Sequence, residues 1–198
     1  MLIKSLIVIV ALLILIGVGY LAYHIYCSQY WKGKKLDNFP FIHRGRMFWY
    51  SRSVATTLFV FAKDKHGELH VLANKRGQGA ADFQGFWNAP CGYLQFDVNG
   101  EENAQREVWE ETGLFVPLNQ INFWKVVSEP SQNKQNVALK YYSMLNGICE
   151  SYTFSTENME DREVDEIAWV PVKNIYSLRW AFGHDSDIVE LVKDFIEK

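Results

Sequence analysis

The chain has few cysteines and almost no net charge. Only Cys27, Cys91 and Cys149 occur in 198 residues, and they stand far apart. An odd number at this spacing argues against a disulfide framework and against a zinc site, so a reducing compartment is the simpler interpretation. The formal net charge is −3, which gives no bulk attraction to nucleic acid. We therefore expect no duplex nucleic acid as a partner.

Charge is also missing from a long run near the N-terminus, Leu6 to Tyr23. About 18 residues of helix span roughly 27 Å, close to the hydrocarbon thickness of a bilayer. A cleaved signal peptide is the alternative, but its apolar region is shorter and small residues follow it. Here bulky Tyr, His and Ile follow instead. The run predicts one transmembrane helix that anchors the protein.

Basic residues indicate which side of the membrane the rest of the chain occupies. Lys4 is the only charged side chain before the run, whereas lysines 32, 34 and 35 follow it. Positive flanks tend to stay cytoplasmic, so we expect a single-pass membrane protein with its C-terminal domain in the cytoplasm. We divide the chain into a tail (1–4), the anchor (5–23), a juxtamembrane linker (24–46) and a globular domain (47–198).

Strands and helices alternate along the globular domain. Asn99 and Glu102 form a capping-box pattern before a helix that Gly113 ends. Asp185 is a fair cap for the last helix, and His184 is typical of capping rather than catalysis. The pattern predicts helices at 100–112 and 186–197, and strands at 53–63, 69–75, 121–129, 137–145 and 166–172. This order indicates an α/β fold, a mixed β-sheet with helices packed on its faces.

Three glutamates fall on one side of the helix at 100–112. Glu107, Glu110 and Glu111 stand at i, i+3 and i+4, where like charges repel. A divalent cation among them would make this arrangement tolerable, and hard oxygen ligands suit Mg²⁺ or Mn²⁺. Arg106 is placed to orient one of the carboxylates. A charged helix that faces solvent is the alternative, and the glutamates alone do not exclude it.

The surrounding residues resemble the Nudix box over positions 92 to 114. The match consists of Gly92, Arg106-Glu107-Val108, Glu110-Glu111 and Gly113-Leu114. One position departs from the box, because Val98 stands where the family has its first glutamate. Asp97, Glu101 or Glu102 is close enough in sequence to replace it. The resemblance covers residues 47–198 and leaves out the anchor.

The resemblance implies a Nudix-like α/β/α sandwich around a mixed sheet. It also implies hydrolysis of a phosphoanhydride bond in a nucleoside diphosphate linked to another group, so a nucleotide-derived small molecule is the expected partner. Carried over by position, the metal ligands for Mg²⁺ or Mn²⁺ are Gly92, through its backbone, Glu107, Glu110 and Glu111. The residues expected to act in catalysis are Glu107, Glu110 and Arg106.

Several assignments stay open at this stage. Glu163 and Glu166 are alternative general bases, and the pair Lys75-Arg76 is a candidate phosphate contact. Nucleobase stacking is possible for four aromatic residues that are more often core, namely Trp49, Trp87, Trp124 and Tyr141. Val98 leaves room for a degenerate Nudix domain that binds a nucleotide or a partner without catalysis. A structural membrane adaptor would leave the box unexplained, and the sequence does not indicate an oligomeric state.

Overall fold

The structure, a computed structural model, describes residues 2–30, 39–131, 135–155, 157 and 162–196. The chain divides into two compact units, Met1–Ser51 and Arg52–Lys198. Each unit is described by itself.

The first unit contains one helix and one hairpin. Helix α1 (Leu2–Tyr30) continues beyond residue 23, where the predicted anchor ends. Strands β1 (Phe39–His43) and β2 (Arg46–Tyr50) pair antiparallel within the stretch predicted as a linker, of which residues 31–38 lie outside the described residues. In the described part of the chain, no helix is both long and apolar enough to cross a membrane, so the predicted span stays a prediction.

The second unit is built on a seven-stranded sheet with the order β5-β4-β3-β8-β7. Strand β6 pairs with β3, and β9 pairs with β4. The pairing of β3 with β8 is parallel and the other pairings are antiparallel, so the predicted mixed sheet is confirmed. The strands are β3 (Ser53–Lys63), β4 (Leu69–Arg76), β5 (Trp87–Asn88), β6 (Cys91–Tyr93), β7 (Asn122–Val127), β8 (Asn136–Ile148) and β9 (Val164–Pro171).

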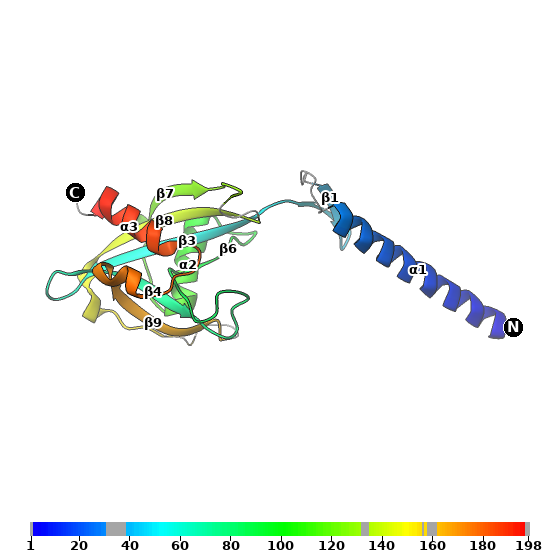
Figure 1. The fold of residues 1–198 in the computed structure, drawn as a ribbon, viewed down its shortest axis with the longest axis horizontal. Helices are drawn as coiled ribbons and strands as arrows, with labels where there is room; N and C mark the ends of the chain where they lie inside the picture. Colours follow the sequence, from blue (N-terminus) through cyan, green and yellow to red (C-terminus); the bar gives the residue numbers. More distant parts are fainter. Residues whose placement is uncertain (1, 31–38, 132–134, 156, 158–161, 197–198) are drawn as a thin grey trace. The chain divides into compact units, whose positions relative to one another are not determined.

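Helices cover both faces of this sheet (Figure 1). Helix α2 (Gly100–Thr112) packs its Ala104 and Val108 onto one face, and helix α3 (His184–Leu191) packs its Ile188 and Leu191 onto the other. Successive side chains of β3 alternate between the two cores: Leu58 lies in the first and Phe59 in the second. The domain is therefore an α/β/α sandwich. Short 3₁₀ turns occur at Leu118–Gln120, Cys149–Ser151 and Val172–Ser177.

The predicted start of α2 is confirmed, whereas that of α3 is wrong. Asn99 and Glu102 form a reciprocal capping box, and Gly113 ends α2 in a left-handed conformation. Helix α3 begins at His184 and not at 186, after Gly183 with a φ of 71° and without a side-chain cap. Neither Asp185 nor His184 therefore caps the helix. Beyond Leu191 the chain continues as a π-helix, Val192–Ile196, and residues 197–198 lie outside the described residues.

Candidate metal and substrate site

Helix α2 directs two of its glutamates toward the strands β4 and β6. Glu111 is only 8% exposed, and the amide Nδ2 of Asn74 on β4 donates a hydrogen bond to its Oε2 at 3.0 Å. The backbone of Cys91 also hydrogen-bonds to the Glu111 carboxylate. Glu107, one turn earlier, accepts a weaker hydrogen bond from Asn103 at 3.4 Å. The two carboxylates that stand four residues apart are thus held between α2 and the sheet.

Gly92 lets β6 approach the Glu107 carboxylate. A Cβ atom at this position would lie 2.2 Å from Glu107 Oε2 and 2.3 Å from Cδ. Such distances are far inside van der Waals contact, so any other residue would displace the carboxylate or the strand. A larger residue here would fit only if the Glu107 side chain moved, so the glycine keeps the carboxylate where the cavity needs it.

The carboxylates of buried Glu111 and half-buried Glu107 resist ionisation in the absence of a cation. Burial, together with the charge of Glu110, raises the pKa of Glu107 to about 7. Burial and the charge of Glu107 raise the pKa of Glu111 well above its usual value. The charges of Arg106 and Arg76 offset this effect only in part, so ionising both carboxylates stays unfavourable without a further cation.

These carboxylates fit a divalent cation that keeps part of its water shell. Among the described residues, no cluster of three or more His, Cys, Asp or Glu side chains is arranged to hold a metal ion. Magnesium in proteins commonly uses one or two carboxylates and takes its other ligands from water and substrate phosphates. Glu107 and Glu111 supply such a pair, and a cation between them would offset the like-charge repulsion and the cost of burial.

Arg106 is held by amides. Its Nη1 donates to Oε1 of Gln95 at 2.6 Å and its Nη2 donates to Oδ1 of Asn103 at 2.7 Å, while Nε lies 3.7 Å from Oε1 of Glu110. Asn103 is buried and also donates to the Thr56 hydroxyl at 2.8 Å. In this chain, Gln95 and Asn103 therefore provide side-chain acceptors for the arginine.

A cavity of about 680 Å³ opens beside the glutamates. Glu107, Glu111 and Gly92 line one part of it, together with Glu163. Glu110 is not among the described residues that line it, so its predicted role as ligand or base stays a prediction.

The structure separates the two candidate general bases. Glu163 lines the cavity, and its charge contributes to the raised pKa of Glu107. Glu166 lies 3.9 Å from Lys75 in an exposed ion pair and does not line the cavity. Asp97, Glu101 and Glu102 do not line it either, so none of them stands in for the glutamate missing at Val98.

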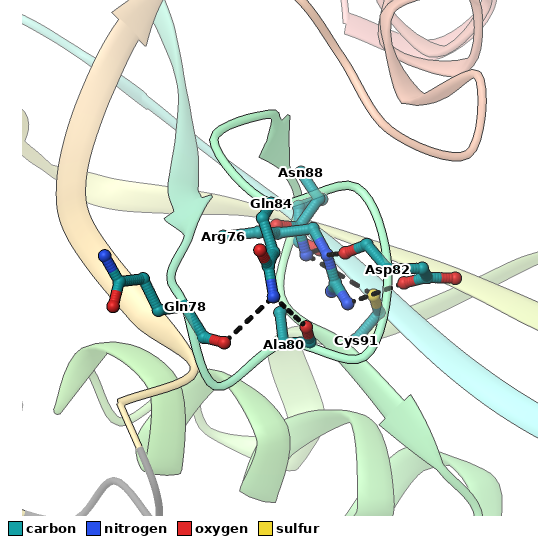
Figure 2. A network of polar contacts seen from close by, with 8 residues as sticks. Arg76, Gln78, Ala80, Asp82, Gln84, Asn88 and Cys91 are labelled. Carbon is teal, nitrogen blue, oxygen red and sulfur yellow. Dashed lines mark hydrogen bonds and ion pairs between the residues drawn. The ribbon is translucent and has the colours of Figure 1, made fainter.

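The loop between β4 and β5 forms the rim of the cavity. Hydrogen bonds from its own side chains hold it in this conformation. Figure 2 shows Gln84 pointing across the loop, where its Nε2 donates to the carbonyls of Gln78 and Ala80 at 2.9 Å. Arg76 donates from Nε and Nη2 to the carbonyl and the carboxylate of Asp82 at 2.9 and 2.8 Å. Of the predicted phosphate contacts, Arg76 lines the cavity, and Lys75 pairs with Glu166 instead.

None of the four aromatic residues considered for nucleobase stacking lines the cavity. Trp87 and Tyr141 are buried in the two cores, and Trp124 packs edge-on against Phe59 at 6.0 Å. Trp49 is exposed on β2 of the first unit.

The cavity is instead lined in part by residues that belong to no motif of the sequence. Among them are Asn74, Phe83, Lys140 and Phe182. His184, interpreted as a helix cap, lines it as well. No local motif marks these positions. That a lysine on a strand is buried beside the cavity can be recognised only when the pairing of the strands is known.

Comparison with known proteins places this geometry in a family. A family model for the NUDIX domain matches residues 51–192. The chain is 29% identical over 126 residues to the protein named MutT4 of Mycobacterium tuberculosis, which covers 61% of this chain and 47% of that protein. The chain thus spans about half the length of this relative.

Two solved structures share the fold. The NUDIX domain of Shewanella oneidensis NrtR, complexed with ADP ribose, has a TM-score of 0.62 at 19% identity, over 73% of this chain and 88% of that one. A bifunctional NMN adenylyltransferase/ADP ribose pyrophosphatase of Francisella tularensis, complexed with AMP and a manganese ion, has a TM-score of 0.57 at 18% identity, over 73% and 42%. At these identities the likeness concerns the fold alone.

A second NrtR structure bears on the nucleic-acid prediction. It contains a 27-mer DNA and has a TM-score of 0.57 at 20% identity, over 73% of this chain and 63% of that one. The expected absence of a duplex partner here is therefore unsupported by the comparisons and stays a prediction. The NUDIX model covers more than half of the sequence, and the box predicted at 92–114 lies inside the match. The chain belongs to the NUDIX domain family.

Proposed function

We propose that the protein hydrolyses a phosphoanhydride bond in a nucleoside diphosphate linked to a further group, with Mg²⁺ or Mn²⁺ as cofactor. The observation that carries the proposal is the carboxylate pair of Glu107 and Glu111, which lie one helical turn apart at the same cavity, with Glu111 buried and Glu107 half-buried. Family membership supports it, as do the ADP ribose and the AMP with manganese bound in the two structural relatives.

The chain's own residues would hold and orient the reacting groups. A divalent cation bound here would neutralise charge on the substrate phosphates and would lower the pKa of a nearby water. Glu107 and Glu111 would hold that cation. Asn74 fixes the orientation of Glu111 through its hydrogen bond at 3.0 Å. Arg106 fixes the side chain of Asn103, which in turn donates to Glu107.

Glu163 is the residue best placed to take the proton from the attacking water. It lies immediately before β9, is exposed to solvent and lines the cavity, where a carboxylate can accept a proton from water. Glu166 faces Lys75 outside the cavity. We assign the base to Glu163 on this ground.

The membrane anchor is part of the proposal. Its support is the uncharged run from Leu6 to Tyr23, the helical conformation of Leu2–Tyr30, and the lysines that follow the run. An inserted helix would place the catalytic unit at the cytoplasmic face, where magnesium and nucleotides are abundant.

The activity is tested with the full-length protein in detergent. Nucleoside triphosphates, nucleotide sugars, dinucleotides and ADP ribose are incubated with Mg²⁺ or with EDTA, and mononucleotide release is measured. We expect turnover that requires metal and falls by at least about 100-fold in Glu111→Gln, because losing transition-state charge stabilisation costs about this much. Glu101→Gln on the same helix is the matched control and should keep full activity.

A binding module without catalysis is the second candidate, favoured by one observation. Val98 supplies no carboxylate, and among the described residues no neighbouring acid takes its place at the cavity. Nucleotide binding without release of any product, in a wild-type protein loaded with Mg²⁺ or Mn²⁺, would favour this function over hydrolysis.

A further inference from the structure

The cavity extends from the glutamates onto a floor made by two parallel strands. On β3 and β8, Ala55 is the register partner of Ala138, and Thr57 is the partner of Lys140. All four residues line the cavity. Three of them are small, so the sheet surface beneath this part of the cavity is flat and leaves room for a ligand group.

Two phenylalanines form the opposite wall. The rings of Phe83 and Phe182 pack edge-to-face with centroids 5.1 Å apart, and both line the cavity. Both residues have left-handed backbones, with φ of 50° and 60°. A bulky residue rarely adopts this conformation, and such strain is typical of functional sites. An alanine floor and an aromatic wall fit a planar ring.

The buried end of this space presents hydrogen-bond donors. Lys140 is 6% exposed and donates to Asp187, which leaves further ammonium hydrogens for a ligand. His184 is 2% exposed, and its Nδ1 accepts a hydrogen bond from the backbone N–H of Ala89 at 3.1 Å. Nδ1 is therefore unprotonated, and Nε2 carries the hydrogen of a neutral ring.

The charges at this end are compensated. Asp187 pairs with Lys140 and, at 3.4 Å, with Lys125 from β7. Arg76 is paired with Asp82 at 2.8 Å. Burial, reinforced by nearby cations, lowers the pKa of His184 well below its usual value, so this side chain is neutral. Donors without net positive charge favour a neutral acceptor over a further phosphate.

We propose that this end of the cavity, between Phe182, His184 and Lys140, is a nucleobase subsite that selects rings with a carbonyl oxygen. The inference rests on the proposed function, which places the phosphates at Glu107 and Glu111 and leaves the rest of the same cavity for the base. Lys140 and His184 donate to the ring carbonyl. An exocyclic amino group at that position is itself a donor and leaves both side chains without an acceptor.

The test uses two nucleotide pairs that differ in this group and in whether the adjacent ring nitrogen carries a hydrogen. Inosine and adenosine triphosphates differ at one ring carbon, as do uridine and cytidine triphosphates. For the full-length protein we expect kcat/KM to favour the carbonyl member of each pair by at least about tenfold, the effect of one charge-assisted hydrogen bond. Lys140→Met should abolish the preference mainly through KM.

Lys125→Met is the matched control, because Lys125 pairs with the same Asp187 and does not line the cavity. It should keep the preference. The double variant Lys140→Met, Asp187→Leu covers the case in which the single variant misfolds, since it removes both buried charges together. It should also lose the preference.

Equal kcat/KM for both members of each pair, or a preference retained in Lys140→Met, would overturn the subsite. Calorimetric binding of the inosine and adenosine diphosphates distinguishes this failure from that of the hydrolase. A carbonyl preference in binding that depends on Lys140, without any turnover, would support the subsite while removing the catalytic proposal.

Discussion

At the scale of single residues, the site depends on the contact between a backbone and a carboxylate. Glu107 lies so close to Gly92 that a methyl group does not fit between them. We expect Gly92→Ala to displace the carboxylate and to lower kcat/KM by at least about 100-fold, the scale of a misplaced catalytic group. Steady-state kinetics with the best substrate of the panel measures the loss.

Gly19→Ala serves as the control for Gly92→Ala, because a Cβ at Gly19 meets nothing within 4 Å. It should leave the kinetics unchanged. An active Gly92→Ala protein with unchanged KM would show that the close approach is not needed for catalysis.

The raised pKa of Glu107 has a consequence for stability. The folded protein holds a proton on this group up to about pH 7, whereas the unfolded chain releases it near 4.5. Folding therefore takes up a proton in this window, and the free energy of unfolding falls as the pH rises from 4.5 to 7. Thermal melting in EDTA at a series of pH values should show this slope.

Two additions to the melting series isolate the cause. Glu107→Gln should reduce the slope, since the amide does not titrate, and Glu111, whose pKa is also raised, accounts for the part that remains. Saturating Mg²⁺ should raise the melting temperature more at pH 8 than at pH 5, because binding requires the ionised carboxylates. If the melting temperature depended on pH equally in wild type and in Glu107→Gln, the raised pKa assigned to Glu107 would be refuted.

The sequence predicted the residues of the site that lie within one motif. Glu107, Glu111 and Gly92 stand at fixed spacings, so the pattern is visible without the fold. Asn74 and Lys140 come from distant strands and reach the cavity only through the pairing of the sheet. One sequence gives no signal for contacts of this kind.

At the scale of elements, α2 is the helix on which the site depends. Its first turn is fixed by Asn99, whose side chain accepts a hydrogen bond from the backbone N–H of Glu102 at 2.9 Å. We expect Asn99→Ala to lower the free energy of unfolding by about 1 kcal/mol, the usual cost of losing an N-cap. Urea unfolding checks this value.

Glu101→Ala is a suitable control for the cap, since it changes an exposed side chain in the same turn. It should alter stability by less than about 0.5 kcal/mol. A loss in Asn99→Ala no larger than in this control would mean that the capping box contributes nothing measurable.

The long elements were predictable because their patterns are long. Strands β3 and β4 follow the predicted ranges closely, and α2 matches in both bounds. Strand β6 has three residues and gives too short a pattern to detect. The start of α3 follows Phe182 and Gly183, both with left-handed backbones, and no side chain caps the helix. The sequence therefore has no N-cap residue that would indicate where this helix begins.

At the scale of the whole molecule, the proposed anchor determines where the enzyme works. We expect the full-length protein to sediment with phospholipid vesicles. Leu13→Asp should weaken this association by roughly 100-fold, because a carboxylate near the centre of a span costs about 3 kcal/mol. Leu118→Asp, an exposed position of the second unit, is the control. Equal sedimentation of Leu13→Asp and wild type would argue against insertion of α1.

The measurement that tests the central claim most directly is Mn²⁺ binding to the full-length protein, followed by electron paramagnetic resonance of the free ion. The account predicts that wild type and Glu101→Gln bind alike, while Glu111→Gln binds at least about tenfold more weakly, since it loses one ionised ligand. Equal binding by wild type and Glu111→Gln would contradict the assignment of a metal to Glu107 and Glu111.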